Sequence, residues 1–259
     1  MKKKILFFDI DGTLLNDEKK ILTSTKEALQ ELQSNGHEIA IATGRNYAMA
    51  KVVIDELDLK NYIVCNGSAG FFHDEQVYEN PLDAADFERL LTVADRNQHQ
   101  MVYETPFMLK RRDEFVDANI KTAMEAVGFG VPEYNSDFYK TNKLVQALLF
   151  YREEDQAIYE NGQFPKFKFV RWHDAGVDIL PRGGSKAKTI LKLSADQGFE
   201  REDIIAFGDG LNDLEMITEV GTGVAMGNAL ETIKLRANKV TANNNEDGIA
   251  IALKEMNLI

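Results

Sequence analysis

The sequence predicts an α/β protein with a doubly wound, Rossmann-like parallel-sheet core that is interrupted by an inserted α+β domain. Short apolar segments typical of buried parallel strands alternate with helical segments near both ends of the 259-residue chain. Between them, residues 82–181 carry strand and helix signals of their own, with Pro81 before the block and Pro181 at its end as hinge points. We therefore expect a core formed by residues 1–81 and 182–259 and an insert at 82–181.

The first five elements follow from apolar periodicity and capping residues. Ser24 and Glu27 match a capping box, and Asn35 with Gly36 matches a helix stop, which together predict a helix at about 24–34. In chain order the sequence predicts a strand at 5–8, this helix, a strand at 37–45, a helix at 47–57 and a strand at 62–65. A βαβαβ order of this kind requires parallel strands.

The same alternation returns in the last third of the chain. The expected elements there are a helix after Ser185, a strand at 203–210, a helix at 211–219, the segment GVAMG at 223–227, a further helix and a strand at 239–242. In the insert, strands are expected at 143–151, 167–172 and 177–180, with helices near 83–98 and 117–127.

Composition limits the classes of partner and compartment. A net charge of −12 argues against a broad nucleic-acid surface, which needs clustered Lys and Arg. Cys65 is the single cysteine, so no intrachain disulfide can form, in agreement with a reducing cytosol. The apolar run at 5–8 is too short for a signal peptide, and no stretch reaches the ~18 apolar residues of a membrane span. We expect a soluble, cytoplasmic protein that binds neither nucleic acid nor membrane, and oligomeric state is left open.

The stretch FFDIDGTLL places Asp9 and Asp11 just after the first strand. Residues i and i+2 of an extended chain share a face, so the two carboxylates would repel each other unless a proton or a cation lies between them. One interpretation is a metal site. The other is a polar strand end that turns at Gly12, with both carboxylates solvated, and this stretch alone favours neither.

Three further polar groups stand where ligands bind in open α/β sheets, beyond the carboxyl ends of the strands. They are Thr43-Gly44-Arg45, Ser185-Lys186, and GDGLND with Asp209, Asn212 and Asp213. Each has an ordinary alternative: Thr43 as a helix cap, Lys186 as a solvated lysine, Asp213 as a first-turn acid. Their convergence favours a site. Carboxylates, a hydroxyl and a lysine fit phosphoryl transfer, in which a carboxylate attacks phosphorus and Mg²⁺ offsets the repulsion between the anions.

These four stretches resemble, in order, the four motifs of the haloacid dehalogenase superfamily of phosphohydrolases. YIVCNG at 62–67 and VTANNNEDGIA at 240–250 further resemble its Cof-type subgroup, which carries a large α/β cap between the second and third motifs. The insert at 82–181 has the position of that cap, and the cap is similar in length and element order more than in sequence.

The resemblance implies a role for each matching residue. Asp9 would be nucleophile and metal ligand, and Asp11 general acid and then base, with its backbone carbonyl on the metal. Thr43, Gly44 and Lys186 would bind phosphate. The remaining implied residues are Asp209 and Asp213 at the metal, Asn212 beside them in phosphate binding, and Asn66, Asn244 and Arg45, each of which could instead act locally. In the insert, Arg171, Trp172 and His173 could face the leaving group.

The sequence thus predicts a Mg²⁺-dependent phosphatase that hydrolyses a small cytosolic organic phosphate, such as a sugar phosphate or a phosphorylated cofactor, through an aspartyl-phosphate. Two alternatives share the core motifs: a dedicated phosphatase resembling those for sucrose phosphate or mannosyl-phosphoglycerate, and a phosphomutase. A third alternative is a catalytically silent phosphate sensor.

Overall fold

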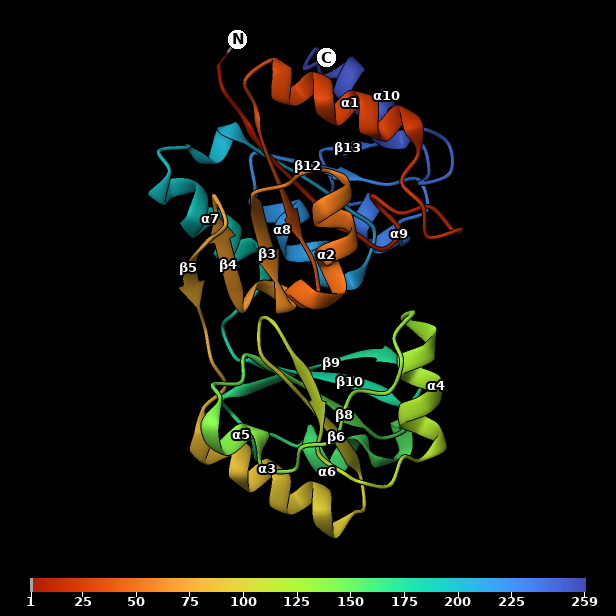
Figure 1. The fold of residues 1–259 in the computed structure, drawn as a ribbon. Coiled ribbons are helices and arrows are strands. Elements are labelled where there is room, and N and C mark those ends of the chain that lie inside the picture. Colours follow the sequence, from red (N-terminus) through yellow and green to blue (C-terminus); the bar gives the residue numbers. More distant parts are fainter. Residues whose placement is uncertain (1) are drawn as a thin grey trace. The chain divides into compact units, whose positions relative to one another are not determined.

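The computed structural model describes residues 2–259, which divide into two compact units (Figure 1). The first unit comprises the chain up to Arg45, Ala50–Tyr78 and Ser185–Ile259, and the second comprises Asn46–Met49 and Glu79–Gly184. The first unit is discontinuous in sequence because the second is inserted into it. Each unit has its own sheet and its own apolar core.

An eight-stranded sheet forms the centre of the first unit. In spatial order its strands are β13 (Lys239–Val240), β12 (Thr222–Ala225), β11 (Ile204–Gly208), β1 (Ile5–Phe8), β2 (Glu38–Ala42), β3 (Asn61–Val64), β4 (Ala69–Phe72) and β5 (Glu75–Glu79). The strands from β13 to β3 pair in parallel, whereas β4 pairs antiparallel with β3. In the centre, Phe8 of β1 lies opposite Phe207 on one side and Ile41 on the other.

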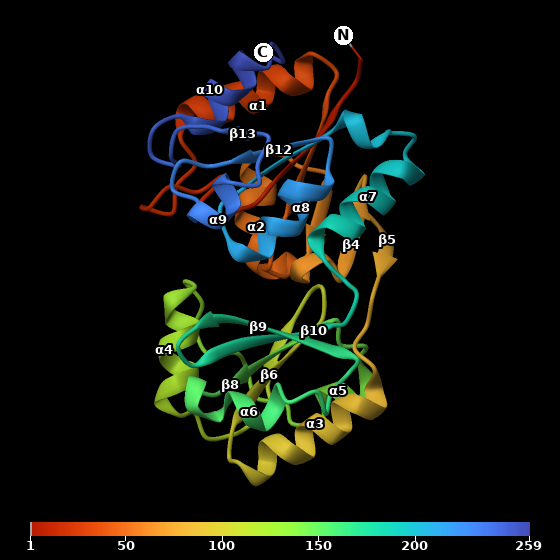
Figure 2. The same cartoon turned by 180° about the vertical axis from the view of Figure 1, so that it is seen from behind.

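Helices bury the faces of this sheet. They are α1 (Thr23–Ser34), α2 (Tyr47–Glu56), α7 (Lys186–Asp196), α8 (Leu214–Glu219), α9 (Glu231–Lys234) and α10 (Gly248–Glu255). Ile190 and Leu193 of α7 and Ile217 of α8 pack in one cluster with Ile5 and Phe7 of β1. Helices α1 and α10 contact each other, and Figure 2 shows them side by side. Because helices cover the sheet, the central strands are apolar along their whole length.

The predicted α/β class is confirmed, and the parallel order of the first strands with it. The predicted capping box of the first helix is wrong. Leu22 is the residue at the N-cap of α1 and Ser24 lies inside the helix, where its hydroxyl bonds to Asp247. The predicted helix stop is confirmed, because Asn35 caps α1 and Gly36 has a left-handed φ of +84°.

The sequence interpretation also missed the hairpin of β4 and β5. Its two turn residues, His73 and Asp74, both have positive φ, as type I′ turns require. The usual sequence signal for such a turn is a glycine, and none is present here. The strand expected at 62–65 ends at Val64, since Cys65 has a φ of +52° and leaves the sheet.

The second unit has a five-stranded antiparallel sheet. In spatial order its strands are β7 (Leu109–Arg111), β6 (Gln100–Glu104), β8 (Gln146–Phe150), β10 (Gly176–Pro181) and β9 (Phe167–His173), and its helices are α3 (Ala84–Arg96), α4 (Ala118–Ala126), α5 (Phe138–Thr141) and α6 (Gln156–Tyr159). Consecutive residues of β6 face opposite sides of the sheet. Met101 packs with Leu90 of α3, and Val102 packs with Ile120 of α4. The sheet is therefore covered by helices on both faces, and β6 and β7 were not expected from sequence.

Gly223 of β12 should be essential for packing β12 against α8. A Cβ added there would lie 1.9 Å from the carbonyl oxygen of Ile217. Gly223→Ala should therefore reduce the free energy of unfolding by about 1–3 kcal/mol, the usual cost of overpacking. Gly130→Ala is the control, because a Cβ at Gly130 meets nothing within 4 Å. Thermal denaturation of both variants tests this, and equal melting temperatures would contradict it.

Candidate active site

Three neighbouring parallel strands bring the predicted site residues together at their carboxyl ends. Asp9 follows β1, Thr43 follows β2 and Asp209 follows β11, and β1 lies between the other two. Lys186 is the first residue of α7, and Ser185 caps this helix by accepting a hydrogen bond from the N–H of Lys188. The topology itself therefore assembles these side chains.

Lys186 lies at the centre of the cluster. Its Nζ donates to Asp9 Oδ1 and to Asp213 Oδ1, both at 2.7 Å. The side chain of Lys186 is 1 % exposed and that of Asp213 is 0 % exposed. Lys186 is thus no solvated lysine and Asp213 no ordinary first-turn acid, because both take part in a buried ion-pair network.

Glycines and backbone N–H groups fix the loop that carries Asp209 and Asp213. Asp213 Oδ2 accepts hydrogen bonds from the N–H groups of Asp209 and Gly210, each at 3.0 Å. A Cβ at Gly208 would lie 2.6 Å from the Cβ of Asp213, and one at Gly12 would lie 2.2 Å from Asp209 Oδ2. Both positions therefore need glycine for the carboxylates to come this close.

The electrostatics of the cluster call for a cation. Burial, together with the charge of Asp213, raises the pKa of Asp9 to about 8 despite its contact with Lys186. Burial and Asp213 also raise the pKa of Asp209 to about 6. Burial alone would lower the pKa of Lys186, but Asp213 and Asp9 more than offset this effect and raise it.

Asp9, Asp209 and Asp213 each offer a carboxylate oxygen within 4.8 Å of the other two. Three carboxylates face one ammonium, which leaves the group negative. Oxygen ligands of this type and spacing suit a hard divalent cation such as Mg²⁺. The carboxylate of Asp11 is not a member of this group.

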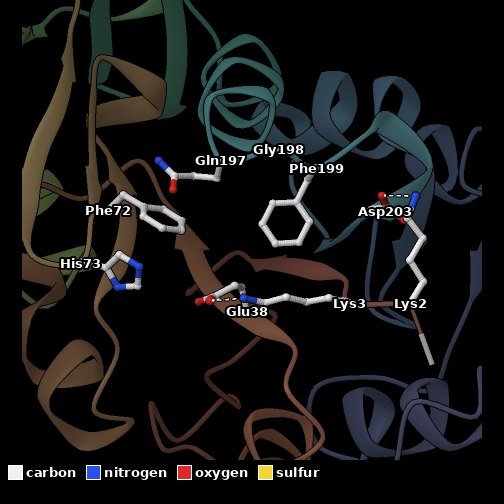
Figure 3. A pocket seen from close by; sticks show the side chains of 9 residues that line it. All are labelled: Lys2, Lys3, Glu38, Phe72, His73, Gln197, Gly198, Phe199 and Asp203. Atoms are coloured by element: carbon white, nitrogen blue, oxygen red, sulfur yellow. Dashed lines mark hydrogen bonds and ion pairs between the residues drawn. The ribbon is translucent and has the colours of Figure 1, made fainter.

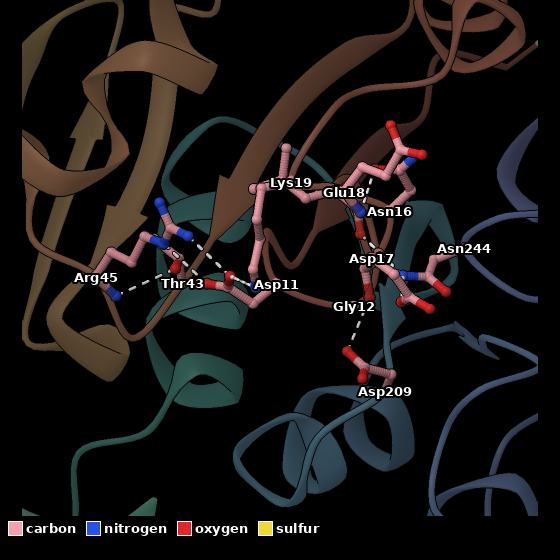
Figure 4. A network of polar contacts seen from close by, with 12 residues as sticks. Asp11, Gly12, Asn16, Asp17, Glu18, Lys19, Thr43, Arg45, Asp209 and Asn244 are labelled. Atoms are coloured by element: carbon pink, nitrogen blue, oxygen red, sulfur yellow. Dashed lines mark hydrogen bonds and ion pairs between the residues drawn. The ribbon is translucent and has the colours of Figure 1, made fainter. Parts of the chain in front are cut away.

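Asp11 instead forms ion pairs with Arg45 and Lys19 (Figure 4). Arg45 donates to both of its oxygens, from Nε at 2.8 Å and from a terminal nitrogen at 2.7 Å, and Lys19 Nζ donates at 3.2 Å. Burial would raise the pKa of Asp11, but Arg45 and Lys19 together lower it. Asp9 and Asp11 therefore do not share one environment, because the extended strand ends at Phe8.

Thr43 is buried in the loop between β2 and α2. Its hydroxyl accepts the N–H of Arg45 at 3.1 Å, and its carbonyl accepts the N–H of Asn66 at 3.0 Å. The helix-cap alternative for Thr43 is wrong, because α2 begins at Tyr47 and the side chain of Asn46 accepts the N–H of Met49. The loop thus holds Thr43 and Gly44 beside the end of β3.

Asn66 and Asn244 have different surroundings. Asn66 Oδ1 accepts a hydrogen bond from Asn212 Nδ2 at 3.1 Å, which joins Asn66 to the loop after β11. Asn244 Nδ2 donates to the carbonyl of Leu15 at 3.0 Å and to Asp17 Oδ1 at 3.3 Å. Asn244 therefore fixes the loop that follows the first motif.

The sequence interpretation missed two residues that contact Asp209. Thr13 donates its hydroxyl to Asp209 Oδ1 at 3.2 Å. Asn228 Nδ2 lies 2.8 Å from the carbonyl of Gly12 and 3.3 Å from Asp209 Oδ2. Asn228 follows the carboxyl end of β12, so the rule that identified the other residues could have found it.

In the second unit, the three residues of β9 singled out in the sequence contact their own hairpin and core. Arg171 donates to the carbonyls of Tyr151 at 2.9 Å and Asp174 at 3.0 Å. Trp172 packs against the cluster around α4. His173 Nδ1 accepts the N–H of Ala175 at 3.2 Å.

A cavity of about 270 Å³ lies at the other end of the core sheet (Figure 3). It is lined by Lys2, Lys3, Glu38, Phe72, His73, Gln197, Gly198, Phe199 and Asp203. Lys3 precedes β1, Glu38 begins β2 and Asp203 precedes β11, so these residues mark the amino ends of the parallel strands. Ligands of open α/β sheets bind at the carboxyl ends, and none of the candidate residues lines this cavity.

Comparison with known proteins agrees with this geometry. The family described as haloacid dehalogenase-like hydrolase matches residues 6–253. The chain is 41 % identical to the putative phosphatase YkrA of Bacillus subtilis, over 100 % of both proteins. It is 32 % identical to the 5-amino-6-(5-phospho-D-ribitylamino)uracil phosphatase YitU of the same bacterium, over 98 % of this chain and 97 % of YitU.

Solved structures share the whole fold. A hypothetical protein from Geobacillus kaustophilus HTA426 superposes with a TM-score of 0.94 at 39 % identity, over 99 % of this chain and 100 % of that protein. The subclass IIB sugar phosphatase BT4131 has a TM-score of 0.86 at 29 % identity, over 99 % and 100 %. The chain therefore belongs to the haloacid dehalogenase-like hydrolases, in the Cof-type subclass IIB, and is a phosphatase of that family. Among residues 2–259, no helix is long and apolar enough to cross a membrane.

Lys186→Met should destabilise the protein in the presence of a chelator. The substitution removes the cation between two buried carboxylates, and breaking a buried pair in this way costs about 3–5 kcal/mol. Urea denaturation in EDTA measures the loss. Lys192→Met is the control, since the exposed Lys192 pairs with the exposed Asp196 one turn away and its loss should matter by less than about 0.5 kcal/mol. Equal losses in the two variants would contradict the buried network.

Proposed function

We propose that the protein is a Mg²⁺-dependent phosphatase that hydrolyses monoesters of small organic molecules through an aspartyl-phosphate on Asp9. The observation that carries this proposal is the group of Asp9, Asp209 and Asp213 around Lys186, in which Asp9, Asp213 and Lys186 are buried. A buried carboxylate at the end of a central strand, beside a cation and a surplus of negative charge, suits attack on a metal-bound phosphate.

Asp9, Asp209 and the backbone carbonyl of Asp11 would hold the metal ion, with Asp213 completing the acidic group. When bound, Mg²⁺ supplies the positive charge that lets one anion approach another. Lys186 and Thr43, with the backbone N–H groups near Asp11 and Gly44, would bind the phosphate oxygens that remain. Asn212 would lie beside them, held by Asn66.

The proposed reaction has two steps, in which Asp9 is the nucleophile and Asp11 transfers protons. An oxygen of Asp9 attacks phosphorus, the bond from phosphorus to the ester oxygen breaks, and Asp11 gives a proton to the departing oxygen. Asp11 then takes a proton from water, whose oxygen attacks the aspartyl-phosphate, releasing inorganic phosphate and restoring Asp9.

The contacts of Asp11 bear on these two roles. Arg45 and Lys19 favour its carboxylate form, which suits the base of the second step. The first step needs the protonated form, so Asp11 must separate from Arg45 before it can act as an acid. On this proposal Arg45 acts through Asp11 and makes no substrate contact of its own.

The substrate class is proposed from the relatives. YitU is named for a phosphorylated ribityl compound and BT4131 is a sugar phosphatase. A sugar phosphate, a sugar-alcohol phosphate or a phosphorylated cofactor is therefore the proposed substrate, and the inserted unit is proposed to select the leaving group.

A hydrolysis screen tests this function. Release of inorganic phosphate is measured with Mg²⁺ and with EDTA, across sugar and sugar-alcohol phosphates, nucleotides, pyridoxal phosphate and flavin mononucleotide. The proposal requires release from at least one monoester with Mg²⁺ and none with EDTA. Full activity in EDTA would exclude the metal, and conversion of a sugar phosphate to its isomer with a bisphosphate would indicate a phosphomutase.

Substitution separates the two acids of the first motif. Asp9→Asn should abolish turnover because no other carboxylate is placed to attack, whereas Asp11→Asn should cost on the order of 10²- to 10⁴-fold in kcat. Mass spectrometry of acid-quenched Asp11→Asn protein should find phosphate on Asp9. Asp196→Asn, an exposed change on α7, is the control. Near-normal turnover by Asp9→Asn would refute the covalent route.

Affinity for Mg²⁺ should depend on pH. The raised pKa values of Asp9 and Asp209 mean that the metal must displace protons below about pH 8. Affinity should therefore be about tenfold or more weaker at pH 6 than at pH 8. Folded carboxyls with raised pKa values also make metal-free protein less stable as pH rises from about 4 to 8. Titration calorimetry and melting curves measure both, and a constant affinity would contradict the raised pKa values.

A further inference from the structure

Three consecutive residues at the end of β3 have positive φ: Cys65 at +52°, Asn66 at +52° and Gly67 at +92°. We call Cys65–Gly67 the left-handed turn. Only glycine adopts such angles without cost, and asparagine tolerates them better than most residues. Cys65 is buried and belongs to neither type, so the surrounding structure must hold it there. Backbone strain that persists in this way occurs mainly at functional sites.

The left-handed turn contacts the loop that carries Thr43. The N–H of Cys65 donates to the carbonyl of Arg45 at 2.9 Å, and the N–H of Asn66 donates to the carbonyl of Thr43 at 3.0 Å. A Cβ at Gly44 would lie 3.1 Å from Asn66 Oδ1. The turn therefore fixes this loop from both sides of Gly44.

The turn also contacts the start of α7, the helix that carries Lys186. A Cβ at Gly67 would lie 2.4 Å from the carbonyl oxygen of Ser185 and 2.7 Å from the nitrogen of Lys186. The hydroxyl of Thr189 donates to the carbonyl of Gly67 at 2.6 Å. Because Gly67 has no side chain, the first turn of α7 packs directly against the backbone there.

The third contact is to the loop after β11. Asn66 Oδ1 accepts the hydrogen bond from Asn212 Nδ2, and Asn212 stands between Asp209 and Asp213 in the chain. The turn thus meets three separate segments that carry proposed phosphate or metal contacts.

We propose that the left-handed turn sets the mutual positions of Thr43, Lys186 and the 209–213 loop, with Asn66 as a positioning residue that acts through Asn212. This inference rests on the proposed function. Because the turn acts on the geometry of the phosphoryl site, its loss should slow every substrate by a similar factor, whatever the leaving group.

Two substitutions of Asn66 distinguish the effect of its side-chain amide from the effect of its left-handed backbone. Asn66→Gly removes the amide but fits a left-handed φ, whereas Asn66→Ala removes the amide and adds strain. Both should lower kcat for acetyl phosphate and for the best metabolite by about tenfold or more, as small displacements in active sites do. The KM for acetyl phosphate should change by less than about threefold, since the substrate contacts remain.

Asn257 provides the matched control. It follows α10, has a φ of +54°, and lies outside the strand ends that carry the site. Asn257→Gly and Asn257→Ala should differ in melting temperature as the two Asn66 variants do, while their kcat stays at the parent value. This comparison isolates the stability cost of the left-handed backbone from the effect on activity.

A double-substitution cycle tests whether Asn66 acts through Asn212. If Asn66 acts through Asn212, Asn66→Gly should cost little more in an Asn212→Ala background. Additive losses would overturn that route. A raised KM with unchanged kcat would show substrate contact instead, and a kcat within about twofold of the parent in Asn66→Gly would overturn the positioning role. A parent protein that releases no phosphate from any substrate would instead refute the proposed function itself.

Discussion

The ammonium of Lys186 between the buried carboxylates of Asp9 and Asp213 is the interaction on which the site depends. A buried cation is tolerated only when it is paired, and here its partners lie in the loops that follow two strands distant in sequence. The sheet order places β1 beside β11, and the start of α7 brings the lysine to both. The apolar strands and the helices that cover them thus hold the side chains of Asp9, Asp213 and Lys186 together.

The environment, not the residue type, distinguishes the two acids of the first motif. Asp9 is enclosed among other carboxylates, and its pKa is raised. Asp11, two residues further on, is 45 % exposed at its side chain and bound by Arg45, and its pKa is lowered. The end of β1 at Phe8 produces this difference, because the turn that follows sends the two side chains to different neighbours. The proposed division into nucleophile and proton carrier has a physical basis in that separation.

Sequence reasoning predicted what periodicity and strand ends determine. It predicted the α/β class, the parallel strands, and the residues after β1, β2 and β11. It missed Asn228, although the same rule applies to β12, which ends at Ala225. The hairpin turn at His73 and Asp74 contains no glycine, and Cys65 has a positive φ although it is neither glycine nor asparagine. Contacts with distant parts of the chain impose these φ angles, and a local sequence pattern therefore does not predict them.

The pairing of β1 with β11 joins Ile5 to Ile204. A ribosome therefore delivers Asp9, the proposed nucleophile, almost two hundred residues before the strand and the lysine that surround it. The inserted unit, whose main segment Glu79–Gly184 is continuous, emerges in between and has its own core. Closing so long a loop is a late and entropically costly event. Phosphatase activity in this architecture is consequently a property that appears only when synthesis of the core is nearly complete, so a truncated chain lacks the site altogether.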